Sequence, residues 1–198
     1  MKKVVVIMLM ALPFVTNAQS QQPFEQSVKG KTCLLPVFRK GYRPQFGISL
    51  VGGIQDNQNF DKSSAVYGLD ISLQCPLLCT EKNYIRQQLS IIQQNGKQLN
   101  TLAIELNPQY RLIAKPVFEL GIGPSFGLIS AEANTDKKSV FTYGLGGSIA
   151  YHVGKMFFTI ESRYGLTNDI SFTDKLHNIT TTNNLNNIRT ILKVGYKI

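Results

Sequence analysis

The segment Asn186–Ile198, NNIRTILKVGYKI, alternates with a period of two. From Ile188 onward every second residue is apolar or nearly so, and most of the residues between them are charged or glycine. Ile191 is the exception, because it is apolar but lies at one of the positions that otherwise hold charged residues or glycine. Successive side chains of a β-strand point to opposite sides. The segment therefore predicts a strand whose two faces meet different surroundings.

Seven further segments past residue 41 repeat this alternation, and turn-rich stretches separate them. One face carries large apolar residues with aromatic residues near the segment ends, and the other carries Gly, Ser and Thr with a charge near the middle. Aromatic girdles around an apolar outer face, and a polar interior, are typical of membrane β-barrels. Most segments have the length of a tilted membrane-spanning strand. The sequence predicts an all-β fold, an eight-stranded antiparallel transmembrane β-barrel.

Connection length supports this prediction and gives an orientation. Three connections on the side predicted to be periplasmic are short: residues 75–83, 114–116 and 154–155. Three on the opposite side are longer and polar: residues 53–63, 131–139 and 168–187. A tight hairpin is predicted at Asn95-Gly96, an Asn-Gly turn signal. Pro108 and Pro124 fall on the outward face, where proline lacks a backbone donor, so we expect ladder defects at both.

The amino terminus resembles an export signal. Lys2 and Lys3 precede an apolar run, Val4–Val15, and small residues follow near Ala18. The sequence predicts a signal peptide over residues 1–18, cleaved after Ala18, a periplasmic tail over 19–41 and a barrel domain over 42–198. The predicted location is the outer membrane. Loss of Lys2 and Lys3 lowers the net charge from +9 to +7, and the remaining basic residues do not cluster as in nucleic-acid-binding proteins, so no nucleic acid is expected as a partner.

Charged residues on the inward face form the main candidate site. Buried charges are costly unless they are paired, so acids and bases should interleave inside the barrel. The predicted interior charge network consists of Asp70, Arg86, Glu105, Arg111, Glu119, Glu161, Arg163, Arg189 and Lys193. The sequence leaves the pairs among them open. A gated ion path is the functional alternative, but eight strands enclose a space that side chains usually fill.

Other site chemistry receives little support. His152, predicted inward near the periplasmic rim, and His177, predicted in the longest outer loop, have no nucleophile motif beside them. We therefore predict no catalytic, cofactor-binding or metal site. An oxidising compartment permits one disulfide among the three cysteines. Cys75–Cys79 is slightly favoured, and pairing with Cys33 in the tail stays open.

Four stretches resemble the small PorT-like outer-membrane β-barrel family of Gram-negative bacteria. They are IELNPQYRL (104–112), FELGIGPSFGLIS (118–130), YGLGGSIAYHVGKMFFTIESRYGLTNDI (143–170) and ILKVGYKI (191–198). The sequence departs from that pattern at Asn107-Pro108, where an apolar residue before proline is more usual, and at a terminal Ile198 in place of Phe. The resemblance implies the barrel fold and an outer-membrane location but no defined activity. By resemblance to other outer-membrane barrels, Tyr196 and Ile198 form the signal that the barrel-assembly machinery reads.

The expected function is non-enzymatic: a barrel whose surface-exposed loops bind something, or which supports the envelope or a larger assembly. Expected partners are outer-membrane lipid, the barrel-assembly machinery and a protein bound by the loops or the tail. Two alternatives are a lipid-modifying enzyme or secretion accessory of the outer membrane, and a soluble lipocalin-like barrel carrying a small apolar ligand. The last requires the apolar face to point inward.

Overall fold

The computed structural model describes residues 46–79, 84–133, 136–174 and 179–198, and these residues form eleven β-strands. The tail and the predicted signal peptide lie outside the described residues. The strands are β1 (Phe46–Asn57), β2 (Ser64–Cys79), β3 (Tyr84–Asn95), β4 (Asn100–Leu106), β5 (Gln109–Ala114), β6 (Phe118–Ala133), β7 (Asp136–Val153), β8 (Met156–Thr167), β9 (Ile170–Asp174), β10 (Ile179–Asn183) and β11 (Asn187–Lys197). None of the described residues belongs to a helix long and apolar enough to cross a membrane.

Nine of these strands close into one antiparallel barrel. The sheet order is β2-β1-β11-β8-β7-β6-β4-β3-β5, and additional pairings join β2 to β3 and β5 to β6. Strands β4 and β5 share one position between β3 and β6, so the barrel has eight strand positions. β11 closes the ring because it pairs with β8 on one side and β1 on the other. The predicted eight-stranded antiparallel barrel is confirmed.

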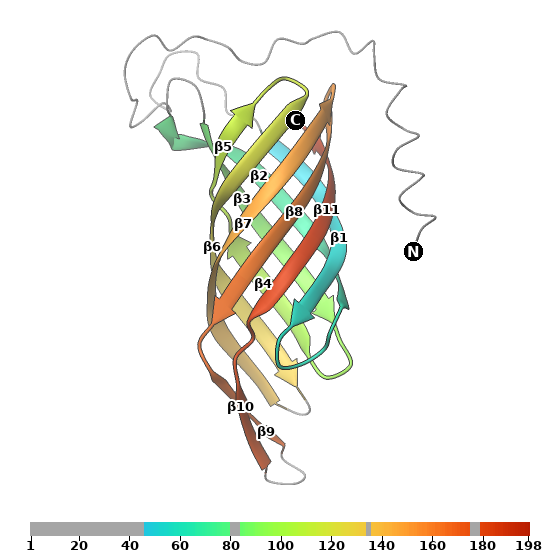
Figure 1. Ribbon diagram of the computed structural model, residues 1–198, viewed down its shortest axis with the longest axis vertical. Helices are drawn as coiled ribbons and strands as arrows, with labels where there is room; N and C mark the ends of the chain where they lie inside the picture. Colours follow the sequence, from blue (N-terminus) through green and yellow to red (C-terminus); the bar gives the residue numbers. More distant parts are fainter. Residues whose placement is uncertain (1–45, 80–83, 134–135, 175–178) are drawn as a thin grey trace.

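The two ends of the barrel differ in shape (Figure 1). At one end, which we call the terminal end, β1 begins at Phe46 and the chain finishes at Ile198, beside the short turn between β7 and β8. At the other, which we call the loop end, the connection 58–63 joins β1 to β2, and the hairpin β9–β10 projects beyond the barrel. The carboxyl terminus and the turn between β7 and β8 therefore lie at the end opposite the projecting hairpin.

The break between β4 and β5 has a sequence cause. The pairs Leu106↔Phe126 and Tyr110↔Ile122 keep one register, which places Pro108 directly opposite Pro124. Two prolines facing each other remove two backbone donors from the ladder at one level. On its other side Asn107 still exchanges backbone hydrogen bonds with Gln88, at 2.7 and 3.2 Å. Neither proline is paired on this side of β6, so both predicted ladder defects are present there. On the other side of β6, Pro124 stays within the continuous pairing with β7.

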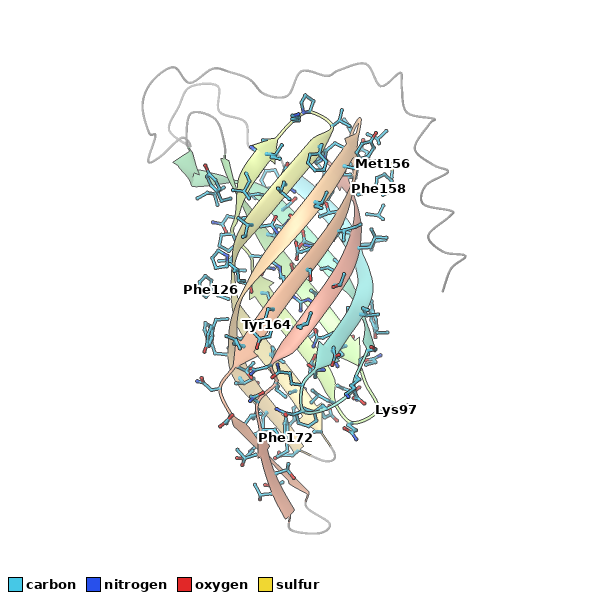
Figure 2. The ribbon with its side chains drawn as sticks, in the orientation of Figure 1. Lys97, Phe126, Met156, Phe158, Tyr164 and Phe172 are labelled. Carbon is cyan, nitrogen blue, oxygen red and sulfur yellow. The ribbon has the colours of Figure 1, made fainter. Side chains whose placement is uncertain are left out.

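The two faces of the barrel have opposite chemistry. Large apolar side chains point outward, as illustrated by Leu50 and Leu128, which are 68% and 60% exposed. Figure 2 shows outward rings toward both ends, with Phe158 near the terminal end and Tyr164 closer to the loop end. Asp70 and Lys193 point inward and are each 1% exposed. The lipocalin-like alternative is therefore wrong, since its ligand would need an apolar lumen.

A small apolar cluster interrupts the polar interior. Ile191 points inward and packs with Val51, Val66 and Ile92. Gly53 lies between Ile191 and Val66 in the sheet, and a Cβ there would overlap the backbone of β11. Ile191 thus follows the strand alternation, and its departure from the charged pattern reflects a local apolar layer inside the barrel.

The loop end is more ordered than the sequence predicted. The fifth connection is mostly strand, because β6 continues to Ala133 and β7 starts at Asp136. Strand β1 also extends into the first connection, as far as Asn57. The seventh connection, predicted as a polar loop, contains the hairpin β9–β10. A buried apolar cluster, which we call the loop-end cluster, joins this hairpin to the barrel. Its members are Leu99, Ala103, Ile129, Ala131, Ala133, Ile170, Phe172 and Leu185, with Phe60 and Val140 packed against them.

Candidate functional site

Charged side chains from three strands meet in the middle of the barrel. The ammonium of Lys193 on β11 lies 2.7 Å from Asp70 Oδ2 on β2 and 3.1 Å from Glu161 Oε2 on β8. Arg163, two residues along the same face of β8, donates to Glu161 Oε1 at 2.6 Å. All four side chains are almost fully buried. The pairing offsets the cost of removing these charges from water.

Glu105 and Arg189 form a second central pair. Both Nη atoms of Arg189 donate to the two carboxylate oxygens of Glu105, a two-pronged contact between β11 and β4. Such paired bonds are strong and fix the relative orientation of the two side chains. The pair crosses the lumen, because β4 and β11 are not neighbours in the sheet.

Neutral polar groups complete the central network. Ser90 donates to Asp70 at 2.6 Å, and Gln109 bridges Glu161 at 3.1 Å and the hydroxyl of Ser148 at 2.8 Å. Gly146 makes room for Arg163, since a Cβ there would overlap the arginine side chain. The sequence analysis did not single out Gln109 as a site residue, although its inward parity, two residues before Arg111, is a signal that could have found it.

A third group lies at the terminal end. The Glu119 carboxylate on β6 forms ion pairs with Arg86 of β3 and with Arg111 of β5, the latter at 3.5 Å. His152 Nε2 on β7 lies 3.4 Å from the same carboxylate. We call these four residues, with Lys197 on β11, the terminal-end charge cluster. The structure brings all nine charged residues of the predicted network into the interior.

Phe157 narrows the lumen beside this cluster. Its ring is 4% exposed and points at Gly195, where a Cβ would overlap the ring. The centre of the ring lies 6.2 Å from that of His152. An aromatic side chain thus fills the space that Gly195 leaves.

The arrangement is a packed interior rather than a channel. A water-filled lumen would leave lining side chains exposed, yet Glu161 is 1% and Gln88 is 2% exposed. The two Nη atoms of Arg163 are buried without a hydrogen-bond partner. Among the residues the structure describes, no three His, Cys, Asp or Glu side chains converge as a metal-ligand set.

The remaining predicted site residues divide between described and undescribed parts. Tyr196 points outward at the terminal end, and the ammonium of Lys155 lies 5.6 Å from the centre of its ring. Ile198 donates its backbone N–H to Phe46 O at 3.0 Å. Cys33 and His177 lie outside the described residues, and so do the side chains of Cys75 and Cys79. The disulfide therefore stays a prediction, as does the assembly signal.

The hairpin β9–β10 has one anchored and one exposed face. Phe172 points into the loop-end cluster, where its ring meets the edge of Phe60 at a centroid distance of 6.0 Å. The Thr173 backbone N–H donates to Asp136 Oδ2 at 3.1 Å. On the opposite face, hydroxyl groups pair across the strands, Ser171 with Thr182 at 2.7 Å and Thr173 with Thr180 at 3.3 Å. The hairpin thus presents a row of hydroxyl groups to solvent.

These features define the class of the protein as an eight-stranded β-barrel with a lipophilic exterior and a filled polar interior. Neisserial surface protein A has the same fold: 12% of aligned residues are identical, the TM-score is 0.51, and the match covers 78% of this chain and 97% of that one. A major outer membrane protein from Thermus thermophilus matches at 8% identity and TM-score 0.49, over 79% of this chain and 100% of that one. Ail of Yersinia pestis matches at 11% identity and TM-score 0.41, over 78% and 97%.

No protein-family model matches the chain, and no curated protein matches it in sequence. The resemblance to PorT-like barrels therefore stays a prediction. The likeness to Neisserial surface protein A shows the fold of an outer-membrane β-barrel.

Proposed function

We propose that this protein is a non-enzymatic barrel of the outer membrane that binds a partner at its loop end through the hairpin β9–β10. One observation carries the proposal: the hairpin projects beyond the barrel while its inner face is fixed to it by Ile170 and Phe172. Loops held by a rigid scaffold are common binding elements, because their side chains are exposed at little cost in ordering.

The exterior supports a membrane location. Apolar side chains cover the outside of the barrel between two levels of aromatic residues, and only a closed barrel satisfies every strand hydrogen bond in lipid. The short turns at the terminal end fit the periplasmic side, and the projecting hairpin fits the cell surface.

The interior supports a binding rather than a catalytic role. His152 is the one histidine among the described residues, and its described contacts are Glu119 and Phe157. Neither residue supplies a hydroxyl or thiol nucleophile, which the acyl-transfer arrangements require. The filled lumen likewise argues against a diffusion pore.

Cysteine labelling tests the orientation. A membrane-impermeant maleimide added to intact cells should label Thr181→Cys on the hairpin and spare Lys155→Cys on the turn between β7 and β8. Labelling of Lys155→Cys alone would reverse the orientation.

Photo-cross-linking in living cells tests the binding role. A photoreactive residue at Thr182, on the exposed hydroxyl face of the hairpin, should capture a discrete partner. The same residue at Lys97, an exposed loop-end position away from the hairpin, serves as control (Figure 2). The same adducts from both positions would show that the hairpin is not the binding element.

A further inference from the structure

The strand β10 has one open edge. It pairs with β9 on one side, and no strand among the described residues pairs with its other side. Thr180, Thr181 and Thr182 are all exposed. The hairpin projects beyond the barrel, so the edge faces solvent at the loop end (Figure 1). An open strand edge presents backbone donors and acceptors with which another strand can pair.

The register of the hairpin shows which backbone groups lie on this edge. The N–H of Thr173 donates to Asp136 Oδ2 at 3.1 Å, so it points away from β10. Opposite residues of an antiparallel pair alternate between hydrogen-bonded and non-hydrogen-bonded pairs, so Thr173↔Thr180 is a non-hydrogen-bonded pair. Thr182 lies two residues further along and has the same orientation. The N–H and C=O groups of Thr180 and Thr182 therefore point out of the hairpin.

The open edge lacks the features that keep edge strands apart. Ile179–Asn183 reads ITTTN, without the charged residues or proline that commonly block pairing at an exposed edge. Its isoleucine and three threonines are β-branched, which favours strands. Phe172 of the neighbouring strand β9 fixes the hairpin to the barrel, so pairing would cost little ordering. The edge therefore suits a partner strand that is itself uncharged.

A second copy of β10 meets this requirement. When two β10 strands run antiparallel about a two-fold axis through Thr181, Thr180 of each copy lies opposite Thr182 of the other. Every outward N–H of these two residues then meets an outward C=O of the other copy. The hydroxyl-bearing faces of both hairpins also join on one side of the combined sheet. The edge is thus self-complementary, as a two-fold contact requires.

We propose that the protein binds a second copy of itself, hairpin to hairpin, through the outer edge of β10. This inference rests on the function proposed above and names the partner of the same site. The hairpin strands run roughly along the long axis of the barrel (Figure 1), so antiparallel pairing places the two barrels on opposite sides of the contact. The two copies then belong to facing membranes. One such contact is small and weak, and many copies on each membrane strengthen it by avidity.

Disulfide trapping tests the register in the full-length folded barrel in non-ionic detergent. Thr181→Cys places two thiols at the two-fold axis, in a non-hydrogen-bonded pair whose Cα separation of about 4.5 Å permits a disulfide. Thr180→Cys is the matched control, because its two copies lie on a diagonal of about 7–8 Å, beyond disulfide reach. After oxidation, mass mapping should find a link between two copies of residue 181 and none between two copies of residue 180. The mapped peptides separate this link from any bond that the native cysteines form.

Proline separates backbone pairing from side-chain recognition. Thr182→Pro removes an N–H that β9 does not use, so the hairpin should stay folded. The two-fold axis doubles the loss, so in the Thr181→Cys background this change should lower the yield of the link by about tenfold or more. Thr182→Val keeps the N–H and should give the same yield as Thr181→Cys alone.

Vesicle clustering tests the contact between facing membranes. Phosphatidylcholine vesicles that carry the unaltered protein should cluster, as measured by light scattering, and vesicles that carry Thr182→Pro should stay dispersed. The self-pairing is overturned by equal links from Thr180→Cys and Thr181→Cys, by the absence of a link, or by clustering that Thr182→Pro does not reduce. Capture of a different protein, and no second copy, by a photoreactive residue at Thr182 overturns the self-pairing but leaves the binding role in place. Capture of nothing overturns both.

Discussion

At the scale of single residues, strand parity predicts which side chains enter the barrel but not which of them meet. Glu105 and Arg189 are 84 positions apart in the chain, and their contact depends on how far the strands are staggered around the ring. Ile191 shows the same limit, because nothing local indicates that its inward position is matched by Val51, Val66 and Ile92 from three other strands. The type of a residue and the face of its strand can be read from the local sequence. Which side chains contact each other across the lumen depends on how the strands close into a barrel.

The Glu105–Arg189 pair makes a direct prediction. Glu105→Leu leaves the buried guanidinium of Arg189 without its carboxylate, and removing one partner of a buried pair costs about 3–5 kcal/mol. Ile104→Val, one residue away on the exposed outer face, should cost less than about 1 kcal/mol. Each variant is heated to a series of temperatures before electrophoresis. The measurement is the temperature at which half of the folded band has been replaced by the band of the unfolded chain. Equal midpoints for the two variants would show that the inward assignment is wrong.

At the scale of elements, the sequence predicts the barrel strands better than the hairpin. The eight segments alternate over long stretches, which is a strong local signal. Strands β9 and β10 have five residues each, and threonine and serine dominate the exposed face of the hairpin, so they resemble a polar loop. What stabilises them is contact with distant residues such as Leu99 and Ala131. Contacts with residues that are distant in the sequence cannot be recognised in the alternation pattern of two five-residue strands.

The attachment of the hairpin should depend on pH through Asp136. The Thr173 backbone N–H holds the pKa of this carboxyl group below its usual value, so its stabilising effect is present above the unfolded-state pKa of about 3.9. The effect should be lost as the pH falls through the lower folded-state pKa. The chain contains no tryptophan, so Phe60→Trp provides a single reporter beside Phe172. Its emission should shift to the red in acid.

The control for this prediction is Asp136→Asn in the same Phe60→Trp background. Asparagine keeps the size of the side chain and does not titrate, so the reporter should be red-shifted at neutral pH and change little in acid. An identical acid shift in both proteins would assign the effect to another group.

At the scale of the whole molecule, closure determines which parts the barrel can lose. β11 pairs with β1 from Asn57↔Asn187 to Gly47↔Lys197, and with β8 from Gly165↔Asn187 to Met156↔Tyr196. The hairpin β9–β10 forms its own two-stranded sheet and contributes no ladder to the ring. The alternation of the last eleven residues already predicted a two-faced closing strand, and the structure adds that this strand carries Arg189 and Lys193 into the central network.

The two regions should therefore respond differently to deletion. Removing Val194–Ile198 unpairs the terminal end of both β1 and β8, and the exposed edges would enter lipid without hydrogen-bond partners. We expect this truncated protein to be exported but degraded before insertion.

The comparison deletes residues 171–182 and joins the ends with a short Gly-Ser linker, which spares the buried Leu185 and the β11 residue Asn187. That variant should insert as a folded, heat-modifiable barrel, with a lower unfolding midpoint because Phe172 leaves the loop-end cluster. Gel migration of unheated and heated membrane fractions measures both variants. If the terminal truncation inserts as well as the hairpin deletion does, the ring does not need β11 to close.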